Sequence, residues 1–182
     1  MQIIPSSIPD VLEIRPTVHG DERGFFIETW NARTFAEAGL NFNFVQDNHS
    51  LSKQGTLRGL HYQIQQPQGK LVRATVGTVY DVAVDMRRSS PTFGKWASCT
   101  LSAEEKNLFW IPPGFAHGFY VLSETAEFQY KCTDYYAPQH DRTLAWNDPS
   151  VGIEWPLVDD MPPLLSAKDE SGQQLPEAEC YE

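Results

Sequence analysis

Thr56-Leu57-Arg58-Gly59-Leu60-His61-Tyr62-Gln63 has the composition of a single β-strand, and it carries an arginine and a histidine three residues apart. Farther along, Ile111-Pro112-Pro113-Gly114-Phe115-Ala116-His117-Gly118-Phe119 places a second histidine among glycine and aromatic residues, in another strand-like setting. Two titratable side chains of this kind on separate strands predict a polar site inside an all-β shell. Such a site either holds a metal ion or performs acid–base chemistry.

Short β-strand patterns recur along most of the chain, separated by turn residues such as Gly77-Thr78 and Pro112-Pro113-Gly114. Regular short strands are typical of a β-sandwich or barrel, and a jelly roll is one such closure, so the predicted fold class is all-β. We expect one short helix at Arg33–Ala38, with Asn31 as its N-cap and Gly39 as its stop. The predicted strands are Phe25–Trp30, Phe44–Asn48, Leu57–Gln63, Lys70–Val76, Val79–Asp85, Trp96–Leu101, Leu108–Ile111, Gly118–Val121 and Ala126–Thr133.

The length of 182 residues predicts one domain over residues 1–182, with a proline-rich tail from about residue 156 that is mostly loop. No apolar run reaches the roughly 18–20 residues of a membrane-spanning helix, and the first residues lack the basic and apolar regions of a signal peptide. Three widely spaced cysteines fit a reducing compartment, so we expect a cytoplasmic protein. The net charge of −10 disfavours nucleic acid as a partner, and no membrane partner is expected.

Alternation along the predicted strands indicates which side chains point inward. Tyr130 shares a face with Phe128 and Cys132, and Lys70 shares a face with Val72, so both polar groups are expected to point into the shell. Strict alternation would instead separate Arg58 from His61. A β-bulge at Gly59 would bring these two side chains to one face, and the sequence leaves open whether it does.

A metal site is the first possible use of the two histidines. Pro112-x-Gly114-x-x-His117 resembles the second half of the metal-binding cupin signature. The first half normally has two histidines separated by one residue and then a glutamate, but His61-Tyr62-Gln63 offers one histidine only. Because a metal site normally has three or more protein ligands, we expect no metal here and keep a metal-dependent cupin oxygenase as a less favoured alternative.

Acid–base chemistry is the use that the surrounding residues favour. Removing a proton from a carbon next to a ketone needs a base, a cation that stabilises the enolate oxygen and an acid that returns the proton. His61, Lys70 and Tyr130 can supply these three parts in that order. The simpler alternatives are a structural histidine, a lysine that extends from a strand end to solvent, and a core tyrosine with a hydrogen-bonded hydroxyl.

Six ordered blocks of the chain resemble the dTDP-4-dehydrorhamnose 3,5-epimerase family, nucleotide-sugar epimerases of the cupin superfamily. The resemblance runs from about Gly20 to Asp169 and implies a cupin jelly roll. Blocks in the family's order are far more specific than any single motif. They are Arg23-Gly24-Phe25-Phe26-x-Glu28, Gln46-Asp47-Asn48-His49-Ser50, Leu57-Arg58-Gly59-Leu60-His61-Tyr62-Gln63, Gln68-Gly69-Lys70-Leu71-Val72-Arg73, Ile111-Pro112-x-Gly114-Phe115-Ala116-His117-Gly118-Phe119 and Tyr130-Lys131-Cys132-Thr133-x-Tyr135-Tyr136.

The resemblance also implies a role for each matching residue. His61 would be the base at C5 and C3 of the keto sugar, and Tyr130 the acid that delivers a proton to the opposite face. Asp169 would hydrogen-bond to His61 and fix its tautomer, and Lys70 would stabilise the enolate oxygen at C4. Phe26 and Tyr135 would form the platform for thymine, and Asp141 stands where the family pattern expects glutamate. The remaining residues implied to bind nucleotide and sugar are Arg23, Glu28, Gln46, Asp47, Asn48, Arg58, His117 and Lys168.

The activity implied by the resemblance is inversion of C3 and C5 of dTDP-4-dehydro-6-deoxy-D-glucose to give dTDP-4-dehydro-L-rhamnose, for dTDP-rhamnose and polysaccharide biosynthesis. It implies a homodimer with exchanged strands and neither a metal nor a redox cofactor. The nearest alternative is an epimerase that inverts C3 or C5 alone, for another dTDP-deoxysugar. A non-catalytic sugar-binding cupin is the least favoured alternative, because base, acid and lysine are all present.

Overall fold

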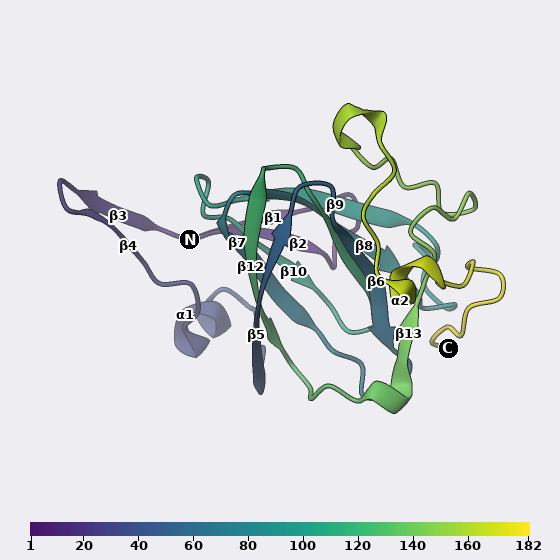
Figure 1. The fold of residues 1–182 in the computed structure, drawn as a ribbon. Helices are drawn as coiled ribbons and strands as arrows, with labels where there is room; N and C mark the ends of the chain where they lie inside the picture. Colours follow the sequence, from purple (N-terminus) through teal and green to yellow (C-terminus); the bar gives the residue numbers. More distant parts are fainter.

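The computed structural model describes all 182 residues and shows two antiparallel β-sheets that enclose the core, with an arm projecting from one side (Figure 1). The larger sheet has six strands in the order β1-β2-β10-β7-β12-β5. Its strands are β1 (Gln2–Pro5), β2 (Leu12–Arg15), β10 (Leu108–Ile111), β7 (Lys70–Val76), β12 (Thr125–Cys132) and β5 (Gln46–Lys53).

The second sheet has five strands in the order β13-β6-β11-β8-β9. They are β13 (Asp141–Thr143), β6 (Leu57–Gln63), β11 (Phe115–Val121), β8 (Thr78–Asp85) and β9 (Trp96–Ser102). The main core lies between the two sheets: Phe109 and Phe128 of the larger sheet are buried with Phe119 and Val79 of the smaller one. The all-β prediction is confirmed, because strands sandwich one apolar layer as in a cupin jelly roll.

The strands predicted at Leu57–Gln63, Lys70–Val76 and Leu108–Ile111 have the observed bounds. The strand predicted at Phe44–Asn48 starts later and runs farther, as β5. Strands β1, β2 and β13, together with β3 (Val18–Asp21), were not predicted. Each has four residues or fewer, and none is a continuous apolar run as the equally short β10 is.

Helix α1 (Ala32–Glu37) begins one residue before the predicted start. Its N-cap is Asn31, as predicted, and the Asn31 side chain accepts hydrogen bonds from the backbone N–H groups of Arg33 and Thr34. Gly39 follows the helix with φ of 84°, a left-handed conformation that glycine adopts readily and that stops a helix.

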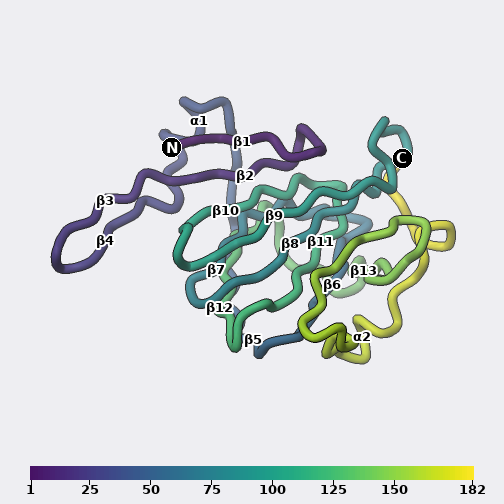
Figure 2. Tube along the Cα trace, turned by 90° about the horizontal axis from the view of Figure 1, so that it is seen from above, coloured from purple at the N-terminus to yellow at the C-terminus, as the bar shows by residue number.

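The arm consists of β3 (Val18–Asp21) and β4 (Gly24–Ile27), which pair only with each other. Figures 1 and 2 show it from two directions, and in both it extends well away from the two main sheets. Phe25 and Phe26 of this arm are 61% and 69% exposed, which is unusual for aromatic side chains. The strand predicted over Phe25–Trp30 corresponds to β4 and ends earlier.

Beyond residue 156 the chain carries two short helical segments, η2 (Val158–Asp160) and α2 (Ala167–Glu170); a third, η1 (Pro138–His140), precedes β13. Backbone hydrogen bonds join Leu164 to Gly55 and Leu57, so the tail is tied to the start of β6. This attachment places α2 beside β6 and β13 (Figure 1). No helix of the structure has the length and apolar character to cross a membrane.

Candidate active site

Two adjoining hollows lie at the end of the sandwich where β6, β7 and β12 come close together. Their volumes are about 280 and 340 Å³. Four side chains line both hollows, which therefore form one site: His61, Lys70, Tyr130 and Lys168. The three residues expected to perform acid–base chemistry are thus brought to a single cavity.

The geometry of β6 explains how Arg58 and His61 reach the same cavity, which both of them line. The register between β6 and β11 shifts near Gly59, as expected for a β-bulge at that residue. Gly59 has φ of 132°, and a Cβ there would lie 2.5 Å from the Cα of Gly118. The bulge therefore requires glycine at this point and turns Arg58 to the face that His61 occupies.

His61 is held by Asp169 of α2. Its Nε2 lies 2.6 Å from Asp169 Oδ1, and the Gly59 N–H donates to the same oxygen at 3.1 Å. Asp169 is buried, yet these hydrogen bonds and a further one from Ser166 hold the pKa of its carboxyl at about 2. Burial lowers the pKa of His61 and outweighs the opposite effect of Asp169. His61 is thus a neutral imidazole that donates from Nε2, and its Nδ1 is free to accept a proton.

Tyr130 and Lys70 belong to the opposite sheet. Tyr130 of β12 packs against the core near Phe128, and burial raises the pKa of its hydroxyl. Lys70 of β7 is buried, and its Nζ donates to the backbone oxygen of His61 at 3.3 Å. Burial lowers the pKa of Lys70, an effect opposed by nearby groups that include Asp141. Base and acid candidates therefore approach the cavity from different walls.

His117 of β11 lies deeper and pairs with Asp81 of β8, with its Nε2 3.0 Å from both carboxylate oxygens. Asp81 was not among the predicted site residues, although a carboxylate inside the apolar run Val79–Val84 was a usable signal. Burial raises the pKa of Asp81, while His117 and Lys70 oppose that shift. No group of three or more His, Cys, Asp and Glu side chains is arranged to hold a metal ion.

The polar rim of the cavity includes Gln46, Asn48, Asp141 and Lys168, all expected to bind substrate. Asp141 accepts hydrogen bonds from Lys168 Nζ and, at 3.0 Å, from the hydroxyl of Tyr136. Tyr136 lines this hollow although it was not among the predicted site residues.

Tyr135, the predicted thymine platform, is 62% exposed and lies outside both hollows, next to Tyr136 in the chain. The Tyr135-Tyr136 doublet was visible in the sequence. In a loop, however, alternation does not say which of two adjacent side chains turns inward.

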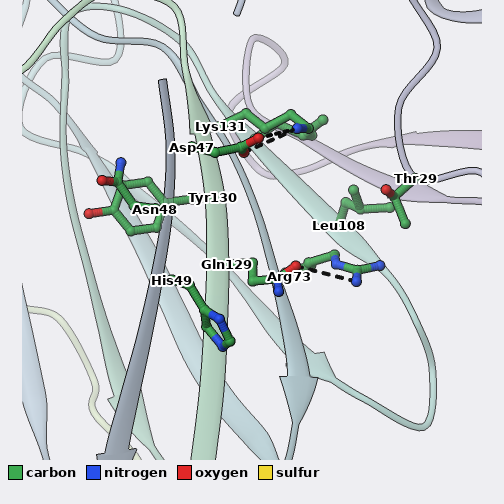
Figure 3. A pocket seen from close by; sticks show the side chains of 10 residues that line it. Thr29, Asp47, Asn48, His49, Arg73, Leu108, Gln129, Tyr130 and Lys131 are labelled. Carbon is green, nitrogen blue, oxygen red and sulfur yellow. Dashed lines mark hydrogen bonds and ion pairs between the residues drawn. The ribbon is translucent and has the colours of Figure 1, made fainter. Parts of the chain in front are cut away.

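Asp47 points to the other side of the larger sheet (Figure 3). There its carboxylate forms an ion pair with Lys131 at 2.8 Å, and it lines a separate hollow of about 310 Å³ with His49. Asn48 and Tyr130 also border this hollow, but Figure 3 shows their side chains on the opposite side of the strands from Asp47 and Lys131. Neighbours along a strand face opposite sides, so Asn48 reaches the cavity of His61 and Asp47 does not.

Three other predicted binding residues lie outside the cavity within a single chain. Arg23 sits on the arm and pairs with Asp21, and Phe26 is exposed on the same hairpin. Glu28 follows β4 and accepts hydrogen bonds from Asn31 and Thr34 at the start of α1. Within one chain, the arm therefore keeps these residues apart from His61.

Comparison with known proteins identifies the family to which the chain is similar. Residues 5–177 match the family model described as dTDP-4-dehydrorhamnose 3,5-epimerase. The Pseudomonas aeruginosa protein of that name is 61% identical over 176 residues, which is 96% of each chain.

Solved structures of related proteins agree as well. An epimerase from Legionella pneumophila, in complex with dTDP-4-keto-L-rhamnose, has a TM-score of 0.94 at 51% identity and covers 98% of this chain and 94% of its own. A 3′-monoepimerase from Streptomyces bikiniensis, in complex with dTDP-quinovose, has a TM-score of 0.88 at 36% identity. The match covers 95% of this chain and 87% of the monoepimerase chain.

The fold and the site together define a cupin-type jelly roll with a cavity between its sheets that titratable side chains line. The family match spans nearly the whole chain. This chain belongs to the dTDP-4-dehydrorhamnose 3,5-epimerase family, and it is an isomerase. The family predicted from the six sequence blocks is therefore confirmed.

Proposed function

We infer that this protein inverts C3 and C5 of dTDP-4-dehydro-6-deoxy-D-glucose to give dTDP-4-dehydro-L-rhamnose for dTDP-rhamnose biosynthesis. The observation that carries this inference is the placement of His61 and Tyr130 on opposite sheets across one cavity. The substrate class follows from the family and from the relative solved with dTDP-4-keto-L-rhamnose. Free thiols at Cys99, Cys132 and Cys180 support work in the reducing cytosol.

His61 takes the first proton. Because Nε2 donates to Asp169, the lone pair of Nδ1 is available for the proton on C5, next to the C4 ketone. The C–H bond breaks, its electron pair forms the C4–C5 double bond, and the former carbonyl pair moves to the C4 oxygen. Asp169 stabilises the resulting imidazolium through the 2.6 Å hydrogen bond.

Lys70 stabilises the enolate that forms. Its ammonium is buried beside His61, where water screens charge poorly and a cation interacts strongly with a new oxyanion. Burial lowers the pKa of Lys70, but the neighbouring carboxylates of Asp141 and Asp81 favour its charged form. The positive charge of Lys70 therefore stabilises the negative charge that develops on the C4 oxygen only when the enolate forms.

Tyr130 returns a proton from the other side. Burial raises the pKa of its hydroxyl, so Tyr130 remains protonated and able to donate at neutral pH. Since β12 and β6 belong to different sheets, the new C–H bond forms on the face opposite to His61 and the configuration inverts. Exchange with solvent then removes the proton from His61 and returns one to Tyr130. A second round at C3, which also adjoins the ketone, completes the reaction.

The direct test follows solvent deuterium into the substrate by NMR. Incubation of the wild-type protein with dTDP-4-dehydro-6-deoxy-D-glucose in D₂O should label both C3 and C5 and yield the L-rhamno product. The absence of exchange at either carbon would contradict the proposed reaction.

Inversion of one carbon alone is the second candidate, because a 3′-monoepimerase shares the fold at 36% identity. The carbons that the wild-type protein labels and inverts separate the two, and Tyr130→Phe, which removes only the hydroxyl, then tests the donor at C5. If Tyr130 is the acid at C5, this variant should exchange substrate protons through His61 yet form little C5-inverted product. Formation of dTDP-4-dehydro-L-rhamnose at the wild-type rate would remove Tyr130 as the donor at C5.

We also propose that the protein acts as a homodimer in which the arm lies against the partner subunit. The support is the arm itself, which projects from the body (Figure 2). It exposes Phe25 and Phe26 and carries Arg23, which lines neither hollow of its own cavity. A second copy would cover these aromatic side chains and receive Arg23 and Phe26 near its own site.

Subunit complementation tests this arrangement. Arg23→Ala and His61→Asn proteins are each purified, mixed, unfolded and refolded together. If the arm acts across the interface, mixed dimers contain one site with both wild-type residues, and activity returns. If it acts within its own chain, no mixed dimer has a complete site, and the mixture is no more active than the average of the two unmixed variants.

A further inference from the structure

Both oxygens of the Asp169 carboxylate have hydrogen-bond donors of their own. Oδ1 accepts from His61 and from the Gly59 N–H, as described above. Oδ2 accepts from the hydroxyl of Ser166 at 2.6 Å, a short distance typical of an O–H donor to a charged acceptor. The oxygen that does not touch His61 is therefore held by a serine that has no role in the chemistry described so far.

Ser166 is also the N-cap of α2. Its side-chain oxygen accepts from the Asp169 N–H at 3.3 Å, so the two residues are joined reciprocally through side chain and backbone. Upstream, the hydrogen bonds of Leu164 to Gly55 and Leu57 fix the main chain against the start of β6. Ser166 is thus a fixed point relative to the strand that carries His61.

We propose that Ser166 is a positioning residue of this active site, whose hydroxyl locks the Asp169 carboxylate in the rotation that keeps Oδ1 on His61 Nε2. The last torsion of an aspartate side chain is soft, so the carboxylate needs an external contact to fix its plane. Its rotation would break the contact that holds the His61 tautomer and stabilises the imidazolium. This inference rests on the proposed role of His61 as base.

The surroundings favour a role in the site over a role in helix capping alone. Helix α2 has four residues, so its own backbone bonds contribute little, and the tail is already tied to β6 through Leu164. Ser166 and Asp169 line the same hollow as His61. The charged or titratable groups that line this hollow with them are Arg58, His61, Lys70, His117, Tyr130 and Lys168.

Ser166→Ala tests the proposal. We expect kcat to fall about 10- to 100-fold, the range for loss of a hydrogen bond to a charged group, with KM within about two-fold of wild type. Deuterium exchange at C3 and at C5 should slow by the same factor, because one base serves both. The Asp169 pKa, followed by carboxyl ¹³C NMR, should rise, and Ser166→Thr should restore most of the activity.

Ser171→Ala is the matched control, because its hydroxyl bonds to Lys168 O at the other end of α2 and does not reach Asp169. It should leave kcat unchanged. Ser166→Gly keeps a favourable N-cap without the hydroxyl, so it should reproduce the loss in a folded protein if Ser166→Ala proves unstable. Wild-type kcat in Ser166→Ala or Ser166→Gly, or an equal loss in Ser171→Ala, would overturn the proposal. If the wild-type enzyme shows no deuterium exchange, the proposed function is wrong. The change in the Asp169 pKa in Ser166→Ala still tests whether the Ser166 hydroxyl bonds to the Asp169 carboxylate.

Discussion

At the scale of single residues, the site depends on environments that move each titratable group toward its proposed task. Burial favours a neutral His61 and a protonated Tyr130, while hydrogen bonds keep Asp169 ionised.

His61→Asn keeps the size and polarity of the side chain but removes the base. We expect exchange at both C3 and C5 to fall at least about 10²-fold, the lower end for a general base. Near-wild-type exchange in a folded His61→Asn protein would remove this residue from the mechanism.

Arg58 reaches the cavity through the bulge, where its Nε donates to Ser52 at 2.9 Å and its guanidinium remains partly exposed. If it binds the pyrophosphate, Arg58→Ala should weaken dTDP binding by about 1.5–3 kcal/mol, the contribution of a hydrogen bond to a charged group. Calorimetric titration measures the change. Arg15→Ala is the control, because Arg15 pairs with Glu13 on β2, away from the cavity. Equal dissociation constants for Arg58→Ala and wild type would place Arg58 outside the binding site.

At the scale of elements, the bulge between β6 and β11 brings Arg58 and His61 together. A Cβ on Gly118 would lie 2.6 Å from the backbone oxygen of Arg58, so Gly118→Ala must push the two strands apart. We expect a loss of unfolding free energy of about 1–3 kcal/mol, as for other overpacked sites, and a lower kcat. Urea unfolding measures the first effect. Gly20→Ala, whose Cβ would meet its nearest neighbour at 3.6 Å, should cost far less, and an equal cost for both would argue against the crowding.

At the scale of the whole molecule, the pair of His61 and Asp169 links α2 to β6 in a pH-dependent way. The pKa of Asp169 is about 2 in the folded protein against 3.8 ordinarily, so its stabilisation is complete above about pH 5 and is lost progressively as the pH falls toward 2. The lowered pKa of His61 acts in the same direction, because the unfolded chain binds that proton first below about pH 6.5. Between pH 7 and pH 3, the Asp169 carboxylate should therefore account for about 1 kcal/mol of the unfolding free energy that wild type loses, a contribution that Asp169→Asn lacks. Parallel urea titrations of the two proteins measure the difference, and equal losses would contradict the assignment.

Metal dependence is a further property of the whole protein, and the metal-dependent oxygenase alternative predicts it. Each cavity histidine bonds to a carboxylate, Asp169 for His61 and Asp81 for His117, and Gln63 stands where a ligand histidine would be expected. Chelator treatment followed by dialysis should leave epimerase activity unchanged. Loss of activity that is restored by a stoichiometric divalent metal would favour the alternative.

The sequence by itself determined what depends on local order along the chain. Alternation and turn residues gave the β class and the bounds of β6, β7 and β10, because side-chain direction in a strand repeats every two residues. The same rule placed Lys70 and Tyr130 inward, and applied to β5 it also separates Asp47 from Asn48. The ordered motif blocks identified the family, and through it His61 and Asp169.

Only the tertiary structure decided what depends on contacts between distant segments. The bulge that unites Arg58 with His61 is a mismatch between two strands, so neither strand encodes it alone. The pairing of β8 with β11 places Asp81 beside His117, and neither strand alone indicates this contact. Tyr136 and Ser166 occupy loop segments whose direction is set by hydrogen bonds to other parts of the chain, and no periodic pattern predicts such bonds.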